Sequence, residues 1–125
     1  MKINLTDAEW KLMTPLWDLA PRTIMELTAA VREETGWSKN TVITMLSRLE
    51  AKGAIRHVEG ERAKHYYPLI QREEAARAET ETFLSKVYGG SLGLMMSAMV
   101  DSHALSEEDI AQLSAILDKA KEDAK

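Results

Sequence analysis

The sequence predicts a mainly helical fold that contains one small β-hairpin. Along most of the chain, segments with apolar residues at helical spacing follow helix-capping residues. Between Gly53 and Leu69 the pattern changes to two short runs rich in Ile, Val and Tyr, separated by Gly60-Glu61-Arg62. The 125 residues include 45% apolar and 29% charged side chains, a balance that favours a folded core over disorder.

Capping boxes mark the first two helices. Residues 5–10 (Leu-Thr-Asp-Ala-Glu-Trp) combine such a box with two flanking apolar residues placed to form a hydrophobic staple. The helix that begins there ends before Pro21. Residues 23–26 (Thr-Ile-Met-Glu) repeat the box and begin a second amphipathic helix, which Gly36 ends.

A third helix begins after Ser38, ends at Gly53 and has two distinct faces. Its inner stripe consists of Val42, Met45, Leu46 and Leu49. The opposite side is polar, and a second helix that leads through a turn at Gly36 into such a helix is typical of helix-turn-helix proteins. Their recognition helix contacts base edges in the major groove of double-stranded DNA. The predicted DNA-binding residues of this helix are Lys39, Asn40, Thr41, Thr44, Ser47 and Arg48.

The hairpin, residues 54–59 and 63–68, is expected to act as a wing. Arg62 and Lys64 lie near its tip, where they are placed to contact backbone phosphates or the minor groove. We therefore predict a winged helix-turn-helix domain over residues 1–69. The hairpin residues expected to cover its core are Ile55, Val58 and one of Tyr66 and Tyr67.

Residues 70–125 are predicted to form a helical dimerisation domain. Residues 71–88 contain no Gly or Pro, a Met-rich segment follows Gly89-Gly90, and Ser106 caps a last helix. About 55 residues are too few to bury the apolar side chains of this region, so we expect a homodimer interface. Packing onto residues 1–69 in a monomer and a Met-rich effector pocket are the alternatives. The expected interface residues are Phe83, Leu84, Val87, Tyr88, Leu92, Met95, Met96, Met99, Ile110, Leu113 and Leu117.

The net charge of −4 is unevenly distributed along the chain. Residues 1–69 have a net charge of +1, whereas residues 70–125 have a net charge of −5. Within residues 37–69, six basic side chains outnumber three acidic ones. The third helix and the hairpin thus form a modest basic patch of the kind that phosphates require.

Several classes of protein are excluded or disfavoured. With no Cys, the chain has no disulfide scaffold, thiolate metal site or cysteine nucleophile. It has no apolar stretch long enough for membrane insertion and no apolar leader, so we expect a cytoplasmic protein. No Gly-rich phosphate loop, HExxH or GxSxG motif occurs, so we predict no enzyme, no catalytic residue, no cofactor and no metal.

Two further alternatives stay open at this point. The side chains of His57, Glu59 and His65 are a weak candidate for a metal site across the hairpin. A winged-helix adaptor that binds protein rather than DNA is also compatible with the acidic C-terminal region.

The sequence resembles the winged-helix repressors of the penicillinase and methicillin-resistance type, the BlaI/MecI family. The similar segments are residues 5–10 and 16–17 (Leu-Trp), residues 37–42 (Trp-Ser-Lys-Asn-Thr-Val), residues 46–53 (Leu-Ser-Arg-Leu-Glu-Ala-Lys-Gly) and residues 66–68 (Tyr-Tyr-Pro). The resemblance implies an N-terminal domain that binds a palindromic operator and C-terminal helices that intertwine in a dimer. By position, it implies DNA contacts for Asn40, Thr41, Thr44, Arg48, Arg62 and Lys64.

The chain departs from this family pattern in two respects. Members of the family can be switched off by proteolysis at a C-terminal Asn-Phe bond, whereas here Thr82 precedes Phe83 and the only Asn residues are Asn4 and Asn40. A sensor protease is therefore an open question as a partner. Copper-responsive relatives use cysteine ligands, which this chain lacks.

Overall fold

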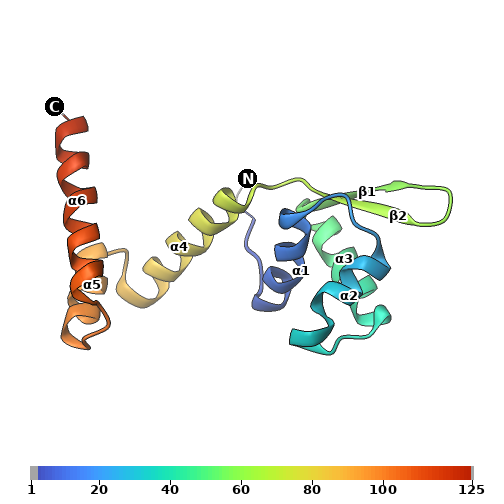
Figure 1. The fold of residues 1–125 in the computed structure, drawn as a ribbon, viewed down its shortest axis with the longest axis horizontal. Coiled ribbons are helices and arrows are strands. Elements are labelled where there is room, and N and C mark those ends of the chain that lie inside the picture. The colour runs from blue at the N-terminus through green and yellow to red at the C-terminus, as the bar shows by residue number, and fades with distance from the viewer. Residues whose placement is uncertain (1–2, 125) are drawn as a thin grey trace. The chain divides into compact units, whose positions relative to one another are not determined.

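The computed structural model describes residues 3–124, which form six α-helices and one two-stranded antiparallel sheet (Figure 1). This confirms the predicted mainly helical fold with one hairpin. Met1, Lys2 and Lys125, which the predicted domains include, lie outside the described residues. The elements are α1 (Asp7–Asp18), α2 (Ile24–Thr35), α3 (Lys39–Ala51), β1 (Ile55–Glu59), β2 (Lys64–Pro68), α4 (Arg72–Tyr88), α5 (Leu92–Asp101) and α6 (Glu107–Asp123).

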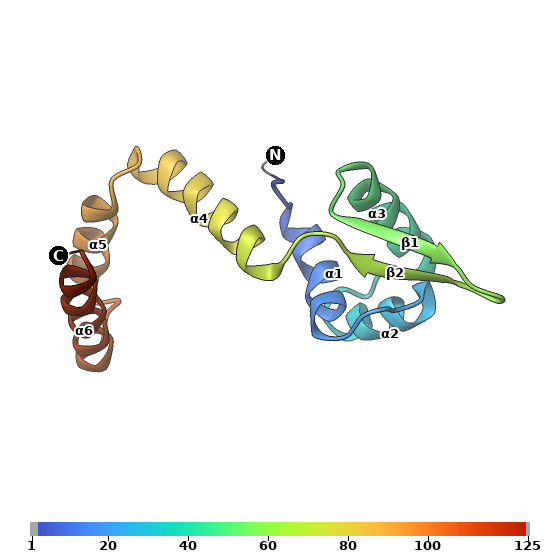
Figure 2. The same cartoon turned by 90° about the horizontal axis from the view of Figure 1, so that it is seen from above.

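The first compact unit, which ends at Thr80, is built from α1, α2, α3 and the hairpin. The three helices pack on one another, β1 packs on α3, and β2 packs on α1 and α2. Figure 2 shows that the tip of the hairpin extends beyond the helices. The largest fully buried apolar side chains of this unit are Leu12, Met13, Leu16, Leu27, Val42, Leu46, Leu49 and Ile55.

Local capping interactions begin the helices of this unit where the sequence predicts them. In α1 the backbone N–H of Glu9 donates to Thr6 Oγ1 at 3.1 Å, and the N–H of Thr6 donates to Glu9 Oε1 at 2.8 Å. Thr23 and Glu26 form the same box at α2. Gly36 ends α2 with φ +66°, a left-handed conformation that a residue with a Cβ rarely adopts.

The register of the hairpin decides which of its residues face the core. Ile55 pairs with Pro68 and His57 pairs with Tyr66, so the inward side chains follow the odd positions of β1. Ile55 and Tyr66 are buried, as expected, but Val58 is 46% exposed. The expectation that Val58 covers the core is wrong. Val58 lies three positions after Ile55 on the same strand, and residues an odd number of positions apart point to opposite faces.

The beginning of α4 belongs to the first unit. Trp17, whose ring packs edge-on against Trp10 with a centroid separation of 5.2 Å, donates its indole N–H to the carbonyl oxygen of Ile70 at 2.9 Å. Ala75 and Ala78 on α4 are buried. The division between the compact units falls between Thr80 and Glu81, inside α4. The functional domain boundary expected between residues 69 and 70 stays a prediction.

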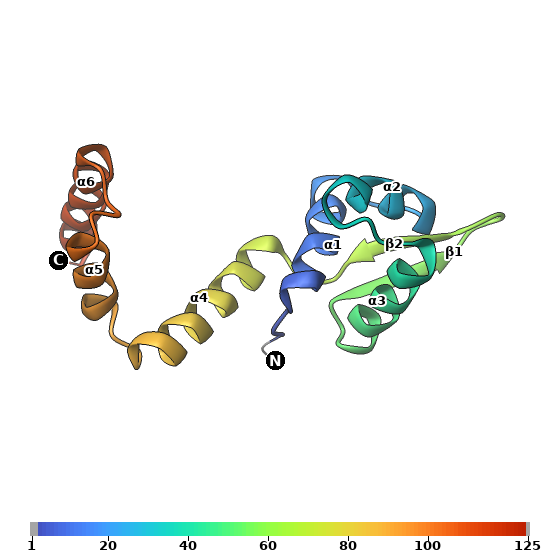
Figure 3. The ribbon, with the colours of Figure 1, turned by 90° about the horizontal axis from the view of Figure 1, so that it is seen from below.

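The second unit contains the end of α4 together with α5 and α6, which follow one another along the chain (Figure 3). Gly89 and Gly90, both with positive φ, separate α4 from α5. Ser106 and Asp109 form a capping box at the start of α6. No residue between 81 and 124 is buried, so this unit has no apolar core of its own. Within residues 3–124, no helix is both long and apolar enough to cross a bilayer.

Candidate nucleic-acid interface

Helix α3 presents a polar face to solvent because its apolar face is buried in the core. Val42, Leu46 and Leu49 are at most 1% exposed, and Met45 is 7% exposed. The remaining side chains of the helix lie on the other side or along its edges. All six predicted DNA-binding residues of this helix, Lys39, Asn40, Thr41, Thr44, Ser47 and Arg48, are exposed.

Two of these polar side chains are already hydrogen-bonded within α3 or to its N-cap. The hydroxyl of Thr44 donates to the carbonyl oxygen of Asn40 at 3.1 Å. The hydroxyl of Thr41 lies 3.2 Å from that of Ser38, the N-cap residue, which also accepts a hydrogen bond from the N–H of Thr41. Thr44 therefore offers a partner its methyl group and oxygen lone pairs, whereas Asn40 offers a free amide suited to adenine.

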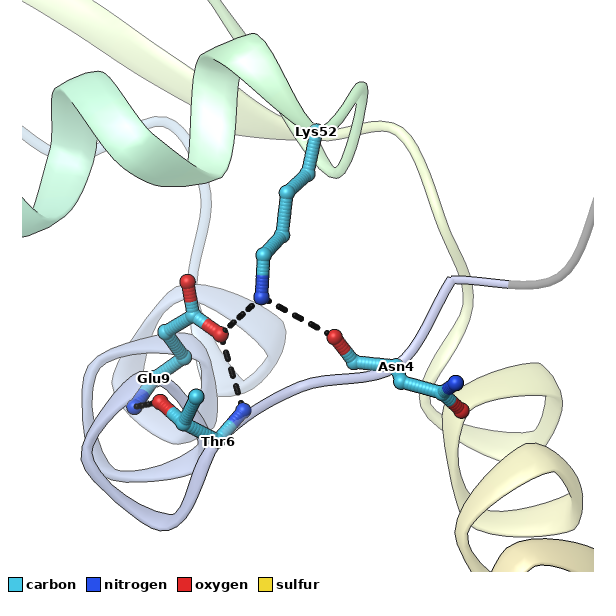
Figure 4. Close-up of polar contacts among 4 residues, drawn as sticks. All are labelled: Asn4, Thr6, Glu9 and Lys52. Carbon is cyan, nitrogen blue, oxygen red and sulfur yellow. Dashed lines mark hydrogen bonds and ion pairs between the residues drawn. The ribbon is translucent and has the colours of Figure 1, made fainter.

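A partly buried ion pair anchors the C-terminal end of α3 to the start of α1 (Figure 4). Lys52 Nζ contacts Glu9 Oε1 at 2.5 Å and donates to the carbonyl oxygen of Asn4 at 3.0 Å. Glu9 is only 2% exposed, so its carboxylate depends on Lys52 and on the N–H of Thr6. Burial acts to raise the pKa of Glu9, but these hydrogen bonds and the charge of Lys52 hold the pKa below its ordinary value of 4.5.

A second polar contact joins α3 to the hairpin. His57 Nδ1 on β1 lies 2.5 Å from Glu50 Oε2 on α3, and its ring packs against that of Tyr66 with a centroid separation of 5.6 Å. Burial, with the negative charges of Glu50 and Glu59, raises the pKa of Tyr66. The contacts of Lys52 and Glu50 could not be predicted from the sequence, because each of these residues pairs with a residue on another element.

The wing closes through a glycine that tolerates no side chain. The N–H of Gly60 donates to the carbonyl oxygen of Ala63 at 2.9 Å. A Cβ at Gly60 would lie 2.7 Å from that oxygen and equally close to the ring of His65. Arg62 and Lys64 are exposed at this end of the hairpin, as predicted.

The fold brings the two predicted groups of cations together. A shallow hollow of about 190 Å³ lies between the N-terminal end of α2, the first residue of α3 and the wing. It joins Lys39 with Arg62 and Lys64, and its lining includes the side chain of Met25, which is 73% exposed. The place of Met25 beside these cations could not be predicted from the sequence, because it depends on how the hairpin folds back over α2. The remaining lining residues are Thr23, Ile24 and Ala63.

The hypothesis of a metal site across the hairpin is wrong. His65 pairs with Val58 and His57 pairs with Tyr66, so the two imidazoles lie on opposite faces of the hairpin. One ring nitrogen of His57 is already bonded to Glu50. Within residues 3–124, no group of three or more His, Asp or Glu side chains is arranged to hold a metal ion.

The predicted interface residues of the second unit all lie at least partly in solvent. Phe83 and Val87 on α4, Leu92 on α5 and Leu117 on α6 are between 47% and 59% exposed. The rings of Phe83 and Tyr88 pack edge-on with a centroid separation of 6.0 Å. Ile110 is exposed, and the partly exposed members of the set are Leu84, Tyr88, Met95, Met96, Met99 and Leu113.

Comparison with known proteins finds similarity over most of the chain. Residues 5–119 match the family model described as penicillinase repressor. The penicillinase repressor of Bacillus licheniformis is 31% identical over 118 residues, which cover 94% of this chain and 92% of that protein.

Two solved structures are similar to the first unit. The DNA-binding domain of the repressor BlaI aligns with a TM-score of 0.53 and 32% identity, over 59% of this chain and 93% of that one. The monomeric form of BlaI from Bacillus licheniformis, solved in complex with the blaP half-operator, aligns with a TM-score of 0.51 and 31% identity, over 57% of this chain and 87% of that one.

The anchor at the end of α3 predicts a specific loss of stability. Lys52→Met keeps the apolar stem but leaves the Glu9 carboxylate without its cation, so the free energy of unfolding should fall by about 1–3 kcal/mol. Lys11→Met is the matched control, because Lys11 only meets Glu34 in an exposed pair at 3.9 Å. Its removal should cost less than about 1 kcal/mol. Equal losses in urea titrations of the two variants would contradict the assignment.

The lowered pKa of Glu9 also predicts how stability depends on pH. Because the folded state holds this pKa below 4.5, the stabilisation is complete above that pH and is lost as the pH falls through the folded-state value. Glu9→Gln removes the titrating group. The free energy of unfolding of the variant, measured by urea titration at neutral pH and at about pH 3, should therefore fall less on acidification than that of the unmodified protein. The same fall in both proteins would exclude Glu9 as a source of the acid sensitivity.

Proposed function

The chain belongs to the penicillinase repressor family of DNA-binding transcriptional repressors, which are not enzymes, and on that premise we propose that it is a homodimer that binds an inverted-repeat operator. In this proposal α3 enters the major groove, and the β1–β2 hairpin contacts the neighbouring phosphates. Bound in the cytoplasm at a promoter, the dimer represses transcription by steric exclusion, and a signal not yet identified relieves the repression.

The observation that carries this proposal is the exposed polar face of α3 next to a basic wing. Asn40, Thr44 and Ser47 lie at helical spacing on the side opposite the buried stripe. Arg48 on the same helix is a residue type that pairs with guanine, and Thr44 offers a methyl group suited to thymine. Lys39, Arg62 and Lys64 around the hollow supply positive charge for backbone phosphates.

The homodimer is proposed because the second unit has no buried residue. Its apolar side chains extend over the end of α4, α5 and α6, and none of them is fully buried within the single chain. A second copy of the same surface is the partner that a two-fold axis supplies. Such an axis also places two recognition helices one turn of DNA apart, roughly 34 Å, which matches an inverted repeat.

Selection of bound genomic fragments, followed by titration at several salt concentrations, tests DNA binding. We expect specific duplexes to be recovered, with an association constant that falls steeply as salt rises. Arg62→Ala should weaken binding to all duplexes alike and reduce the salt slope by about one, whereas Thr44→Ala should alter base preference. Arg77→Ala, which removes an exposed arginine from α4, is the control for the loss of one positive charge.

The proposal would be refuted if the protein bound no duplex, or if its affinity for DNA did not depend on salt. Either result would favour a winged helix that binds protein. A protein partner recovered by the Arg77→Ala control and lost from Arg62→Ala would support that alternative.

Sedimentation at micromolar concentration tests the dimer. We expect a dimer that Leu117→Glu weakens at least about tenfold, because the substitution places an unpaired charge at two symmetric positions of an apolar interface. Gln112→Glu adds the same charge on another face of α6 and should leave the association unchanged. A protein that stays monomeric at this concentration, or equal effects of the two substitutions, would refute the interface.

A further inference from the structure

One side chain on the exposed surface of α3 does not fit its polar surroundings. Ile43 is 37% exposed, whereas the other large aliphatic side chains of the helix are buried as the inner stripe. It follows Asn40 by three residues and precedes Ser47 by four, so the three side chains are neighbours along the helix surface. An aliphatic group thus lies among the side chains that the proposed function assigns to the operator.

The position of Ile43 places it along the edge of α3 that faces the hairpin. Glu50 on that edge contacts His57 of β1, and Lys39 on that edge lines the hollow that contains Arg62 and Lys64. By helical spacing, Ile43 lies between Lys39 and Glu50. It is therefore bracketed by the cations proposed to hold phosphate at one end and by the contact that fixes the hairpin at the other.

The chemistry of the major groove restricts what an aliphatic side chain can contact there. The base edges present hydrogen-bond donors and acceptors, and the only apolar group among them is the 5-methyl of thymine. The side chain of Ile43 is stiff, because its branched Cβ leaves one strongly preferred rotamer in a helix. Little conformational entropy is lost when such a side chain is held against a small apolar group.

We propose that Ile43 determines sequence specificity by packing against the 5-methyl group of a thymine in each operator half-site. This assignment rests on the proposed function, since it requires α3 to enter the major groove. Thr44 is the competing source of a methyl contact, and its hydroxyl is already bonded to the carbonyl oxygen of Asn40. Ile43 offers the larger aliphatic surface and has no polar atom that requires a partner.

Replacement of single thymines by deoxyuridine tests the proposal, because it removes the methyl group and leaves base pairing intact. The probes are a duplex recovered by the genomic selection and its singly substituted versions, titrated with the full chain. At one thymine of each half-site, the unmodified protein should lose affinity about fourfold, which corresponds to about 0.8 kcal/mol for one methyl contact. Ile43→Ala and Ile43→Gln should bind the thymine and uracil versions equally at that position.

Two comparison variants make the test specific. Leu19→Ala shortens an exposed aliphatic side chain outside α3 and should keep the full discrimination between thymine and uracil. Thr44→Ser removes the competing methyl group and should keep the discrimination at the thymine that Ile43 contacts. The slope of affinity against salt should be the same for Ile43→Ala as for the unmodified protein, because no phosphate contact is lost.

The proposal is overturned if no thymine shows the loss, if Ile43→Ala and Ile43→Gln keep it, or if Thr44→Ser abolishes it. In each of these cases, salt-dependent binding of the unsubstituted duplex would leave the proposed function standing. A failure of the proposed function is recognised separately, since the unsubstituted duplex would then not be bound at all.

Discussion

Four side chains of α3, namely Val42, Met45, Leu46 and Leu49, are almost wholly removed from water in the core of the first unit. Burial of each contributes about 1.5–3 kcal/mol, so the helix cannot turn about its axis without a large loss of free energy. This constraint decides which residues of α3 are left on the surface. The contacts of Lys52 with Glu9 and of Glu50 with His57 then fix the helix against α1 and β1, so that the polar face and the wing keep one relative position.

Most of the fold could be predicted because its signals are local. The boxes predicted at Thr6 and Thr23 and the cap predicted at Ser106 each require only residues within one helical turn, and all three are present in the structure. The helix break at Gly89-Gly90 and the reverse turn at Gly60 are likewise properties of a few adjacent residues. The exposure of the predicted DNA-binding residues follows from the same helical period, since the apolar stripe of α3 is evident in the sequence.

What could not be predicted depends on pairing between elements. The positions of Val58 and His65 follow from a hairpin register that no single strand specifies, and a shift of one residue would exchange the two faces. The division of the chain inside α4 follows from the packing of Ala75 on a core formed by distant residues. The partner of Glu9 is 43 residues away, and only the folded chain brings Lys52 to it.

The modest charge of the recognition segment and the absence of a core in the second unit have a common explanation in the proposed dimer. The cations that each protomer offers to phosphates around the hollow are few, namely Lys39, Arg62 and Lys64. A single DNA-binding unit with so few phosphate contacts would bind DNA weakly at physiological salt. When two DNA-binding units are joined, the binding of the second unit becomes intramolecular. Its high effective concentration at the DNA then raises the overall affinity above that of either unit alone. Because no residue of 81–124 is fully buried in the single chain, the same association would bury the apolar side chains of the second unit and bring two DNA-binding units together. Any signal that separates the protomers would then remove most of the operator affinity without touching α3.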